Sequence, residues 1–210
     1  MIYLISNTPS SDESIKNLNL SQIKFYDFSV DLANFNAIVI TSKNAIKALE
    51  QNSIALKDVE IFAVGKSSAA QAEKFGFKKI NVSSSSYGDA LYDEFKDVLK
   101  DRKILYLRAK DIVGDLDIKL AKCSQNFTQI VAYESIEVTQ NLTDLEDNSV
   151  FIFTSPKNAK FFLKNYTWRD SFKAVAIGQS TAEALKFISG VRVPKAQSID
   201  ECIKLAKTLL

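Results

Sequence analysis

The chain of 210 residues contains no histidine. Imidazole is the general base of Ser-His-Asp and Cys-His enzymes and a frequent ligand of transition metals, so its absence excludes those mechanisms and most sites for such metals. Chemistry in this protein must therefore use tyrosine, lysine, arginine, carboxylates, hydroxyl groups or backbone dipoles.

Cysteine is scarce as well. The chain has two cysteines, Cys123 and Cys202, and neither belongs to a CxxC pair. This pattern predicts neither a disulfide framework nor a zinc site. We expect both side chains to be small residues of the core.

Long apolar runs and a strong net charge are also missing. No run reaches the roughly twenty apolar residues that cross a bilayer, and segment 1–6 lacks the basic start and cleavage site of a secretory signal. The 27 basic and 25 acidic residues leave a net charge of +2, which argues against general binding to nucleic acid or to a membrane. We expect a cytoplasmic protein that recognises anions only locally.

The common nucleotide-binding motifs are absent too. The chain has neither a Walker sequence nor GxGxxG, and Gly65-Lys-Ser-Ser resembles the end of a phosphate loop without its earlier glycine. A nucleotide-binding enzyme of the common kinds is therefore not expected.

An internal repeat organises what is present. The apolar run 150–153, followed by Thr-Ser-Pro, predicts a buried strand that feeds a helix, and segment 37–42 has a similar sequence. Three pairs stand at the same offset of 113 positions, namely Thr41 and Thr154, Ser42 and Ser155, and Gly65 and Gly178. Matched strand-to-helix turns at one offset predict a duplicated α/β unit.

A looser repeat precedes each of these units. Segment 104–108 echoes 1–5, and 130–135 echoes 23–28, so that Tyr106 corresponds to Tyr3 and Tyr133 to Tyr26. The sequence predicts strands at 2–5 and 23–30 around a helix at 10–17, with a helix at 112–124 in the counterpart.

Strands and helices alternate through the rest of the chain. Further strands are predicted at 37–40, 61–64, 79–82, 150–153 and 191–194, with a closing helix at 199–209. This order predicts an α/β fold of parallel sheets covered on both faces, with about five strands per flavodoxin-like domain. The N-terminal piece joins either the segment that follows it or the C-terminal piece. Either arrangement leaves a cleft between two similar domains, and spacing alone does not decide between them.

Hydroxyl-bearing and small residues recur where the predicted strands end. Open α/β sheets bind ligands there, because the following helices present free backbone N–H groups. The candidate positions are Thr41, Ser42, Gly65, Ser67, Ser68, Thr154, Ser155, Gly178, Ser180 and Thr181. Helix capping explains each one alone, but the set predicts a site for a ligand that carries many carboxylates or phosphates.

Four titratable residues stand at predicted strand ends or linkers. Tyr133 and Tyr26 are protonated at neutral pH, since a phenol has a pKa near ~10, and could donate a proton to a leaving oxygen. The simpler interpretation of Tyr133 is a half-buried strand aromatic. Arg108 and Lys110 follow the strand 104–107 and either pair with anionic groups or are solvated loop charges.

The chain as a whole resembles the uroporphyrinogen-III synthase family. The matching segments are Ile40-Thr-Ser-Lys-Asn-Ala, Ala63-Val-Gly-Lys-Ser-Ser-Ala, Ile104-Leu-Tyr-Leu-Arg, Ile130-Val-Ala-Tyr-Glu, Phe153-Thr-Ser-Pro-Lys-Asn-Ala and Ala176-Ile-Gly-Gln-Ser-Thr-Ala. Each is weak alone, but together they span nearly the whole chain in the family's order. Many members carry an arginine after the first strand, where this chain has Ser6-Asn-Thr.

The resemblance implies two flavodoxin-like parallel-sheet domains joined by a two-stranded linker. Residues 1–30 and 138–210 form one domain, 36–132 form the inserted domain, and 31–35 and 133–137 are the linker strands. It also implies a monomer that needs no cofactor and no metal, with the upstream hydroxymethylbilane synthase as a partner.

The implied activity is that of a hydro-lyase in haem biosynthesis. The family cyclises hydroxymethylbilane, a linear tetrapyrrole with eight carboxylates, to uroporphyrinogen III, with loss of water and inversion of ring D. The family's tyrosine that assists departure of the hydroxyl falls on Tyr133. Its ligand-contacting turns fall on Thr41, Ser42, Gly65, Ser68, Thr154, Ser155, Gly178 and Thr181. Ser67, Ser180 and Arg108 are further candidate contacts. The alternative is a non-catalytic two-domain module that binds or senses a small polyanion in its cleft. A flavodoxin-like response module is disfavoured, because no acidic cluster precedes a predicted magnesium site.

Overall fold

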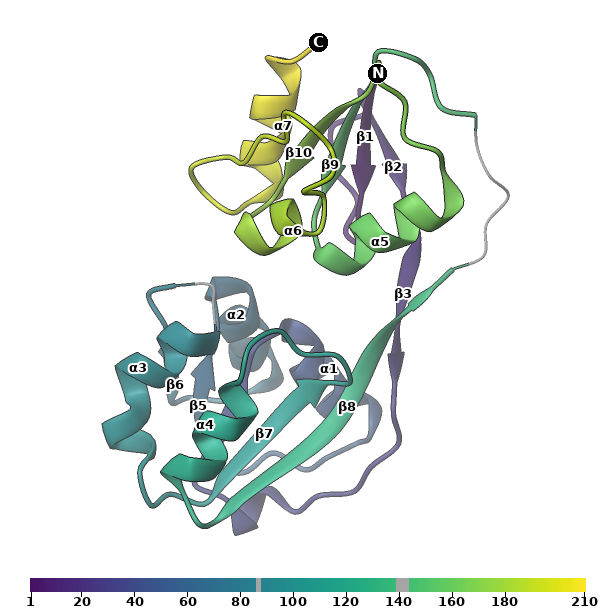
Figure 1. Ribbon diagram of the computed structural model, residues 1–210. Coiled ribbons are helices and arrows are strands. Elements are labelled where there is room, and N and C mark those ends of the chain that lie inside the picture. Colours follow the sequence, from purple (N-terminus) through teal and green to yellow (C-terminus); the bar gives the residue numbers. More distant parts are fainter. Residues whose placement is uncertain (86–87, 139–143) are drawn as a thin grey trace. The chain divides into compact units, whose positions relative to one another are not determined.

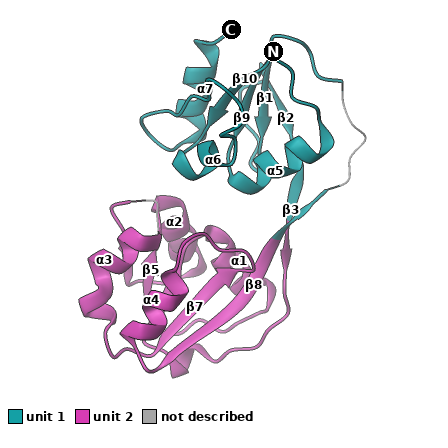
Figure 2. Ribbon diagram, in the orientation of Figure 1, with its two compact units in different colours: residues 1–22, 135–210 teal, residues 23–134 magenta. Residues whose placement is uncertain are grey.

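The computed structural model describes residues 1–85, 88–138 and 144–210 and divides the chain into two compact units. Unit 1 consists of Met1–Gln22 with Ser135–Leu210, and unit 2 is Ile23–Glu134 (Figure 2). The middle of the chain is thus the inserted part, which the sequence left undecided until the family resemblance was considered. Of the expected domain piece 138–210, residues 139–143 lie outside the described residues.

Unit 1 is built on a parallel sheet with the order β10-β9-β1-β2. Its elements are β1 (Ile2–Ile5), β2 (Ile15–Leu18), β9 (Val150–Phe153), α5 (Pro156–Asn165), β10 (Lys173–Ala176), α6 (Gln179–Glu183) and α7 (Ile199–Lys207). Strands β1 and β9 are buried at every residue, because helices cover both faces of the sheet. Core residues of α5 pack on one face and those of α7 on the other (Figure 1).

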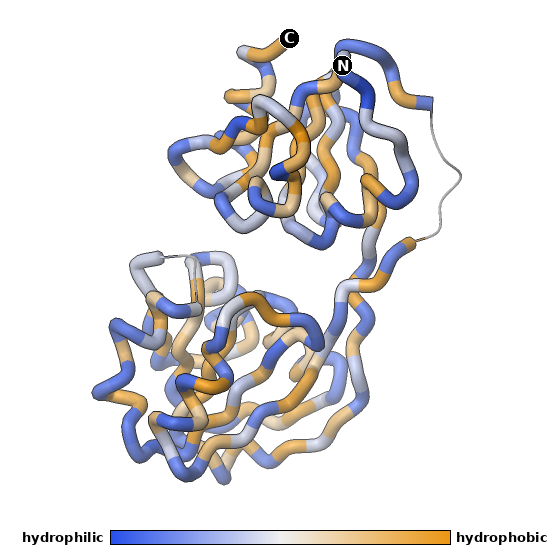
Figure 3. The backbone as a smooth tube through the Cα atoms, viewed as in Figure 1, coloured by the Kyte–Doolittle hydropathy of each residue, from blue (hydrophilic) through white to orange (hydrophobic). Residues whose placement is uncertain are grey.

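Unit 2 contains the larger sheet, with the order β3-β8-β7-β4-β5-β6. Its elements are β3 (Ser21–Phe25), η1 (Leu32–Asn34), β4 (Ala37–Ile40), α1 (Lys43–Gln51), β5 (Glu60–Ala63), α2 (Lys66–Phe75), β6 (Ile80–Val82), α3 (Gly88–Leu99), β7 (Ile104–Ala109), α4 (Leu116–Cys123) and β8 (Phe127–Glu137). Helices α1 and α2 pack on one face and α3 and α4 on the other. Figure 3 shows hydrophobic residues recurring along the trace of both units, and the buried clusters lie on both faces of each sheet.

The chain passes between the units twice, along β3 and β8. These strands are neighbours in the sheet and run antiparallel, since Tyr26 N–H donates to Ala132 C=O at 3.0 Å while Val138 N–H donates to Leu20 C=O at 3.0 Å. The expected linker strand at 31–35 differs from this arrangement. That segment holds the short 3-10 helix η1, and the strand opposite β8 lies about ten residues earlier in the chain.

Two sequence predictions of local structure are wrong. The helix expected at 10–17 is a turn followed by β2, because Asp12 Oδ1 accepts hydrogen bonds from the N–H and hydroxyl of Ser14 and closes a turn instead of starting a helix. The strand expected at 191–194 is a single bridge between Arg192 and Val175. The described sheet of unit 1 therefore has four strands rather than five.

Candidate functional site

The turn after β4 carries two of the predicted site residues, Thr41 and Ser42. Ser42 is extended, with φ −154°, and its hydroxyl accepts a hydrogen bond from the Asn44 N–H at 3.2 Å, which caps α1. This residue therefore has the capping role that any serine at a helix start can have. Thr41 stands directly beyond the buried strand and is half-buried.

A β-bulge brings Tyr133 to this turn. Strand β8 pairs with β7 in regular register up to Arg108 and Val131, but Ala109 then pairs with Tyr133, so that Ala132 is the extra residue. Side chains alternate between faces along a regular strand, whereas Ala132 and Tyr133 are both buried in the core on the α1 side. The bulge thus turns Tyr133 toward the face on which α1 begins.

The Tyr133 phenol is enclosed by this packing and is 5% exposed. Burial raises its pKa, and hydrogen bonds with the side chains of Ser42 and Thr41 partly offset that rise. The phenol is accordingly protonated at neutral pH, with two hydroxyl groups within hydrogen-bonding reach. Tyr133, Thr41 and Ser42 are thus predicted site residues that the structure brings together.

Arg108 stabilises the bulge. Its guanidinium donates from Nε to Gln129 Oε1 at 2.7 Å, and from Nη1 to the carbonyls of Ala109 at 2.9 Å and Lys110 at 3.1 Å. The Lys110 N–H in turn donates to the Tyr133 C=O at 2.8 Å. Arg108 therefore has a structural role, and binding of an anionic ligand would be a second role.

A charged cluster lies beside Tyr133 on the adjacent residue, Glu134. Its carboxylate is 3.2 Å from Lys110 Nζ and 3.9 Å from Lys24 Nζ, and it accepts a hydrogen bond from Tyr26. The hydrogen bond from Tyr26 contributes most to lowering the pKa of Glu134, and Lys110 adds to the effect. Lys110 and Tyr26 are therefore engaged with a carboxylate of the protein itself.

The second turn of unit 2 follows β5 at Gly65 and neighbours the first, since the Val64 N–H donates to the Ile40 C=O at 2.9 Å. Gly65 has φ +76°, a conformation that L residues rarely adopt, and no side chain caps α2. Ser67 is exposed, whereas Ser68 is 4% exposed and its N–H donates to the Gly65 C=O. The amides of Lys66 and Ser67 and the Ser67 hydroxyl are thus the groups that this turn offers to a ligand.

The corresponding turn of unit 1 is occupied by contacts within the protein. Thr154 Oγ1 donates to the Ile5 C=O at 2.9 Å, and Ser155 Oγ accepts from the Asn158 N–H at 3.1 Å. Asn158 is 5% exposed and donates from Nδ2 to Thr154 Oγ1 at 3.2 Å and to the Ile5 C=O at 3.3 Å. Its Oδ1 lies 2.6 Å from the hydroxyl of Ser21, where β3 begins.

The last predicted turn, at Gly178, repeats the plan of the Gly65 turn. The Ile177 N–H donates to the Phe153 C=O at 3.0 Å, as its counterpart does in unit 2. Ser180 is exposed, and Thr181 is 1% exposed. Gly178 has φ −164°, which any residue adopts, but an added Cβ would lie 2.7 Å from Gln197 Nε2. The two glycines therefore serve different needs, a left-handed turn and a close approach.

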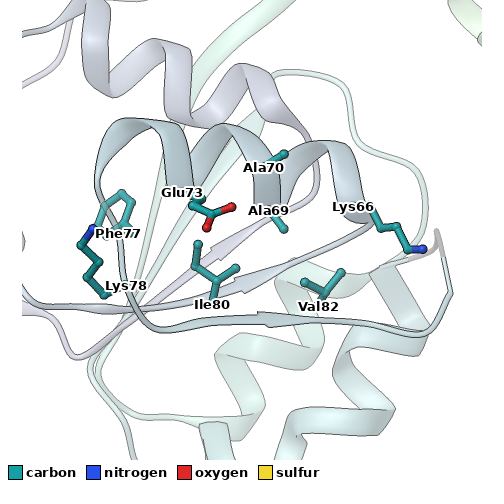
Figure 4. Close-up of a pocket in the computed structure, with 8 residues that line it drawn as sticks. All are labelled: Lys66, Ala69, Ala70, Glu73, Phe77, Lys78, Ile80 and Val82. Atoms are coloured by element: carbon teal, nitrogen blue, oxygen red, sulfur yellow. The ribbon is translucent and has the colours of Figure 1, made fainter.

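A groove of about 450 Å³ lies between α2 and the outer strand β6 of unit 2. Figure 4 shows Ile80 and Val82 along one side, the small residues of α2 opposite, and Lys66 and Lys78 toward its two ends. None of the predicted site residues lines this groove, and Lys66, which follows Gly65, is its nearest residue in sequence to the predicted turns.

Two features of the site were not predicted from the sequence. One is the bulge at Ala132, which a run of β-forming residues does not reveal. The other is Tyr106 on β7, which is 1% exposed and whose pKa, raised by burial, is partly lowered by the hydroxyl of Thr41. Within a strand, an alternating buried aromatic indicates core packing, and its hydroxyl partner depends on tertiary structure.

Known proteins match this fold and sequence along almost the whole chain. The model of the family described as uroporphyrinogen-III synthase HemD matches residues 18–204. An Archaeoglobus fulgidus protein named "Putative uroporphyrinogen-III synthase" is 24% identical over 200 residues, which cover 89% of this chain and 85% of that protein.

Solved structures agree with these matches. The crystal structure of uroporphyrinogen-III synthetase from Helicobacter pylori has a TM-score of 0.84 and 27% identity and covers 100% of this chain and 99% of its own. A mutant uroporphyrinogen III synthase from Thermus thermophilus, at 11% identity and a TM-score of 0.61, covers 99% and 97% and shows the fold alone.

These findings define a two-domain protein of repeated parallel α/β units. The chain belongs to the uroporphyrinogen-III synthase family. Membership assigns it that family's function, a lyase activity in tetrapyrrole biosynthesis, and confirms the predicted family, fold class and function. Within the residues that the structure describes, no helix is long and apolar enough to span a membrane.

Proposed function

We propose that the chain closes hydroxymethylbilane into uroporphyrinogen III, with Tyr133 as the residue that assists departure of the ring-A hydroxyl. The observation that carries this proposal is the placement of a buried, protonated phenol against the hydroxyls of Thr41 and Ser42 at the carboxyl end of β4. A phenol in this setting is a weak acid that can donate to an oxygen on which negative charge develops.

The proposed step returns to Tyr133 the proton that it gives up. The Tyr133 proton joins the departing hydroxide, so that water leaves and a phenolate remains. Bond formation through the spiro-pyrrolenine intermediate and restoration of the pyrrole release one proton, which returns to the phenolate. The net change is loss of one water, and the phenol is regenerated without a redox partner.

The turns of each unit are proposed to hold substrate carboxylates. Burial of Ser68 and Thr181 supports a division in which Ser67 and Ser180, with the amides that follow Gly65 and Gly178, contact the ligand. Arg108 adds a cation, and the backbone amide of Ser155 adds a donor, since the Thr154 amide and the hydroxyls of both residues are engaged within the protein. Fixing many carboxylates at once restricts a flexible chain to a reactive conformation.

We also propose that the enzyme acts as a monomer in the cytoplasm and receives its substrate from hydroxymethylbilane synthase. The family resemblance supports all three statements. Size-exclusion chromatography with light scattering measures the oligomeric state, and a pull-down with the upstream enzyme tests the partnership.

The decisive assay is incubation with freshly prepared hydroxymethylbilane, followed by separation of the product isomers. Without an enzyme the chain closes with ring D uninverted, so the expected product is the type III isomer in excess over a protein-free control. Type I product alone, as in the control, would show that the reaction proposal is wrong. Binding of the substrate without type III product would favour a non-catalytic polyanion-binding module.

A further inference from the structure

The outer edge of strand β6 carries backbone groups that the sheet of unit 2 does not use. β6 stands at the end of the strand order and pairs with β5 on its inner side. The Lys79 C=O accepts a hydrogen bond from β5 at 2.8 Å, and the Ser83 N–H donates one to β5 at 3.0 Å. Backbone groups of successive strand residues point to opposite edges, so those of Ile80 and Val82 point outward. Within the described part of the chain, neither residue's N–H or C=O forms a hydrogen bond.

The groove between α2 and β6 runs beside this free edge. The side chains of Ile80 and Val82 line one side, and Val82 is 39% exposed (Figure 4). Ala69 and Ala70 line the other side and leave a space of about 450 Å³. A strand added beside β6 would take up the free backbone groups and direct alternate side chains toward this space.

Charged side chains mark the two ends of the groove. Lys66 and Lys78 are exposed and point to opposite ends (Figure 4), and among the described residues neither has an ion pair or a hydrogen bond. The neighbouring Lys79, by contrast, lies 2.9 Å from Asp58. The carboxylate of Glu73 lies between the two free lysines.

The length of the groove sets the spacing of a complementary ligand. Helix α2 has ten residues and is therefore about 15 Å long. Residues four positions apart in an extended strand span about 14 Å and share one face. An extended peptide can thus place one acidic residue at each end of the groove and a hydrogen-bond donor between them, beside Glu73.

We propose that the free edge of β6 and this groove form a docking site for an extended segment of another protein, with acidic residues four positions apart. A second copy of β6 does not fit this description. It would bring its own Lys78 and Lys79 to the lysines of the groove, and like charges across paired strands are destabilising.

The duplicated fold does not itself require such a surface. In the described residues of unit 1, the helix that corresponds to α2 is α6, which has five residues. The segment that corresponds to β6 forms a single bridge, through Arg192. The edge and the groove are therefore features of unit 2 rather than of the repeat.

The first experiment titrates the ¹⁵N-labelled full-length protein with an acetylated and amidated peptide of sequence Glu-Val-Thr-Val-Glu. Its sequence is the same in both directions, so it assumes neither parallel nor antiparallel pairing. We expect saturable shifts of the Ile80 and Val82 amide resonances, no shifts in β2, the edge strand of unit 1, and no binding of Lys-Val-Thr-Val-Lys. Unshifted Ile80 and Val82 resonances at millimolar peptide, or equal binding of both peptides, would overturn the proposal.

Exchange of the lysines tests the charge pattern. Lys66→Ala and Lys78→Ala should each weaken binding of the acidic peptide roughly 2- to 5-fold, the range of an exposed ion pair. Lys74→Ala, a matched change on α2 outside the groove, should leave the affinity unchanged. The double variant with Lys66→Glu and Lys78→Glu should bind the basic peptide instead, with thermal melts showing that it folds. A double variant that still preferred the acidic peptide would contradict the proposed site.

Hydrogen exchange tests the backbone pairing independently of charge. The amides of Ile80 and Val82 should exchange more slowly when the acidic peptide is bound, because they gain hydrogen bonds to it. The same peptide with its three central nitrogens methylated keeps both carboxylates but loses its central donors, so it should not bind. Unchanged exchange at both amides, or full binding of the methylated peptide, would show attraction by charge alone and overturn strand addition.

Discussion

The two copies of the strand-to-helix turn have similar sequences and different partners. In unit 1, Thr154 donates to a carbonyl of the neighbouring strand, and Asn158 ties that strand to the start of β3. In unit 2, the hydroxyl of the corresponding Thr41 partly offsets the burial that raises the pKa values of Tyr106 and Tyr133. Duplication supplied two similar turns, and the residues around them decide whether a hydroxyl stabilises the fold or supports the proposed chemistry.

The largest expected effect on stability comes from the asparagines of the two turns. Asn158→Ala should lower the free energy of unfolding by about 2 kcal/mol, because it removes the hydrogen bonds that this buried amide makes with Ser21, Thr154 and the Ile5 carbonyl. Its counterpart Asn44 is half-buried, and among the described residues its side chain has no hydrogen bond, so Asn44→Ala should cost under about 0.5 kcal/mol. Urea denaturation measures both, and equal losses would contradict the division between the turns.

The glycines give an intermediate effect. Gly65→Ala should lower the unfolding free energy by roughly 1–2 kcal/mol, because alanine is strained at φ +76° although space is open around it. Gly178→Ala meets only the end of the Gln197 side chain and should cost less than about 1 kcal/mol. Thermal melts of the two variants test this order, and a more damaging change at Gly178 would reverse it.

The smallest effect concerns ion pairs and their pH dependence. Burial opposes ionisation of Glu60, but hydrogen bonds from Arg102 and Asn81 outweigh it and lower its pKa. Its contribution is therefore present above the ordinary pKa of a glutamate and is lost as the pH falls through the lowered value.

Glu60→Gln should cost under about 1 kcal/mol at neutral pH, and the difference from wild type should shrink in acid. The more exposed pair Lys16–Glu146 of unit 1 provides the comparison, with a smaller change expected for Glu146→Gln. Urea midpoints measured across pH test both variants, and a difference that grew as the pH fell would contradict the role assigned to Glu60.

The sequence predicted the parts of the molecule that depend on local pattern. The runs Ala37–Ile40 and Val150–Phe153 are apolar throughout and form fully buried parallel strands. The segment 10–17 misled because Ser-Asp-Glu residues begin turns as readily as helices, and here Asp12 closes a turn. The register of β8 could not be predicted from local pattern either, since the extra residue Ala132 becomes evident only when β8 is paired with β7.

The sequence also predicted only part of the candidate site. Thr41 and Ser42 follow from the strand-to-helix junction, and Tyr133 followed from the family resemblance rather than from its own surroundings. The hydroxyl of Tyr106 could not be assigned a partner from the sequence, because Thr41 comes from another strand. The burial of Ser68 and Thr181 also emerges only once the helices are packed.

The most direct test compares the turnover of Tyr133→Phe with that of Tyr26→Phe, its counterpart in the other repeat. The Tyr26 hydroxyl is hydrogen-bonded to Glu134, so Tyr26→Phe should leave kcat within about twofold of wild type. Tyr133→Phe removes the proposed proton donor and should lower kcat by about 100-fold without abolishing type III product. Wild-type turnover by Tyr133→Phe would contradict the account and return this phenol to a structural role.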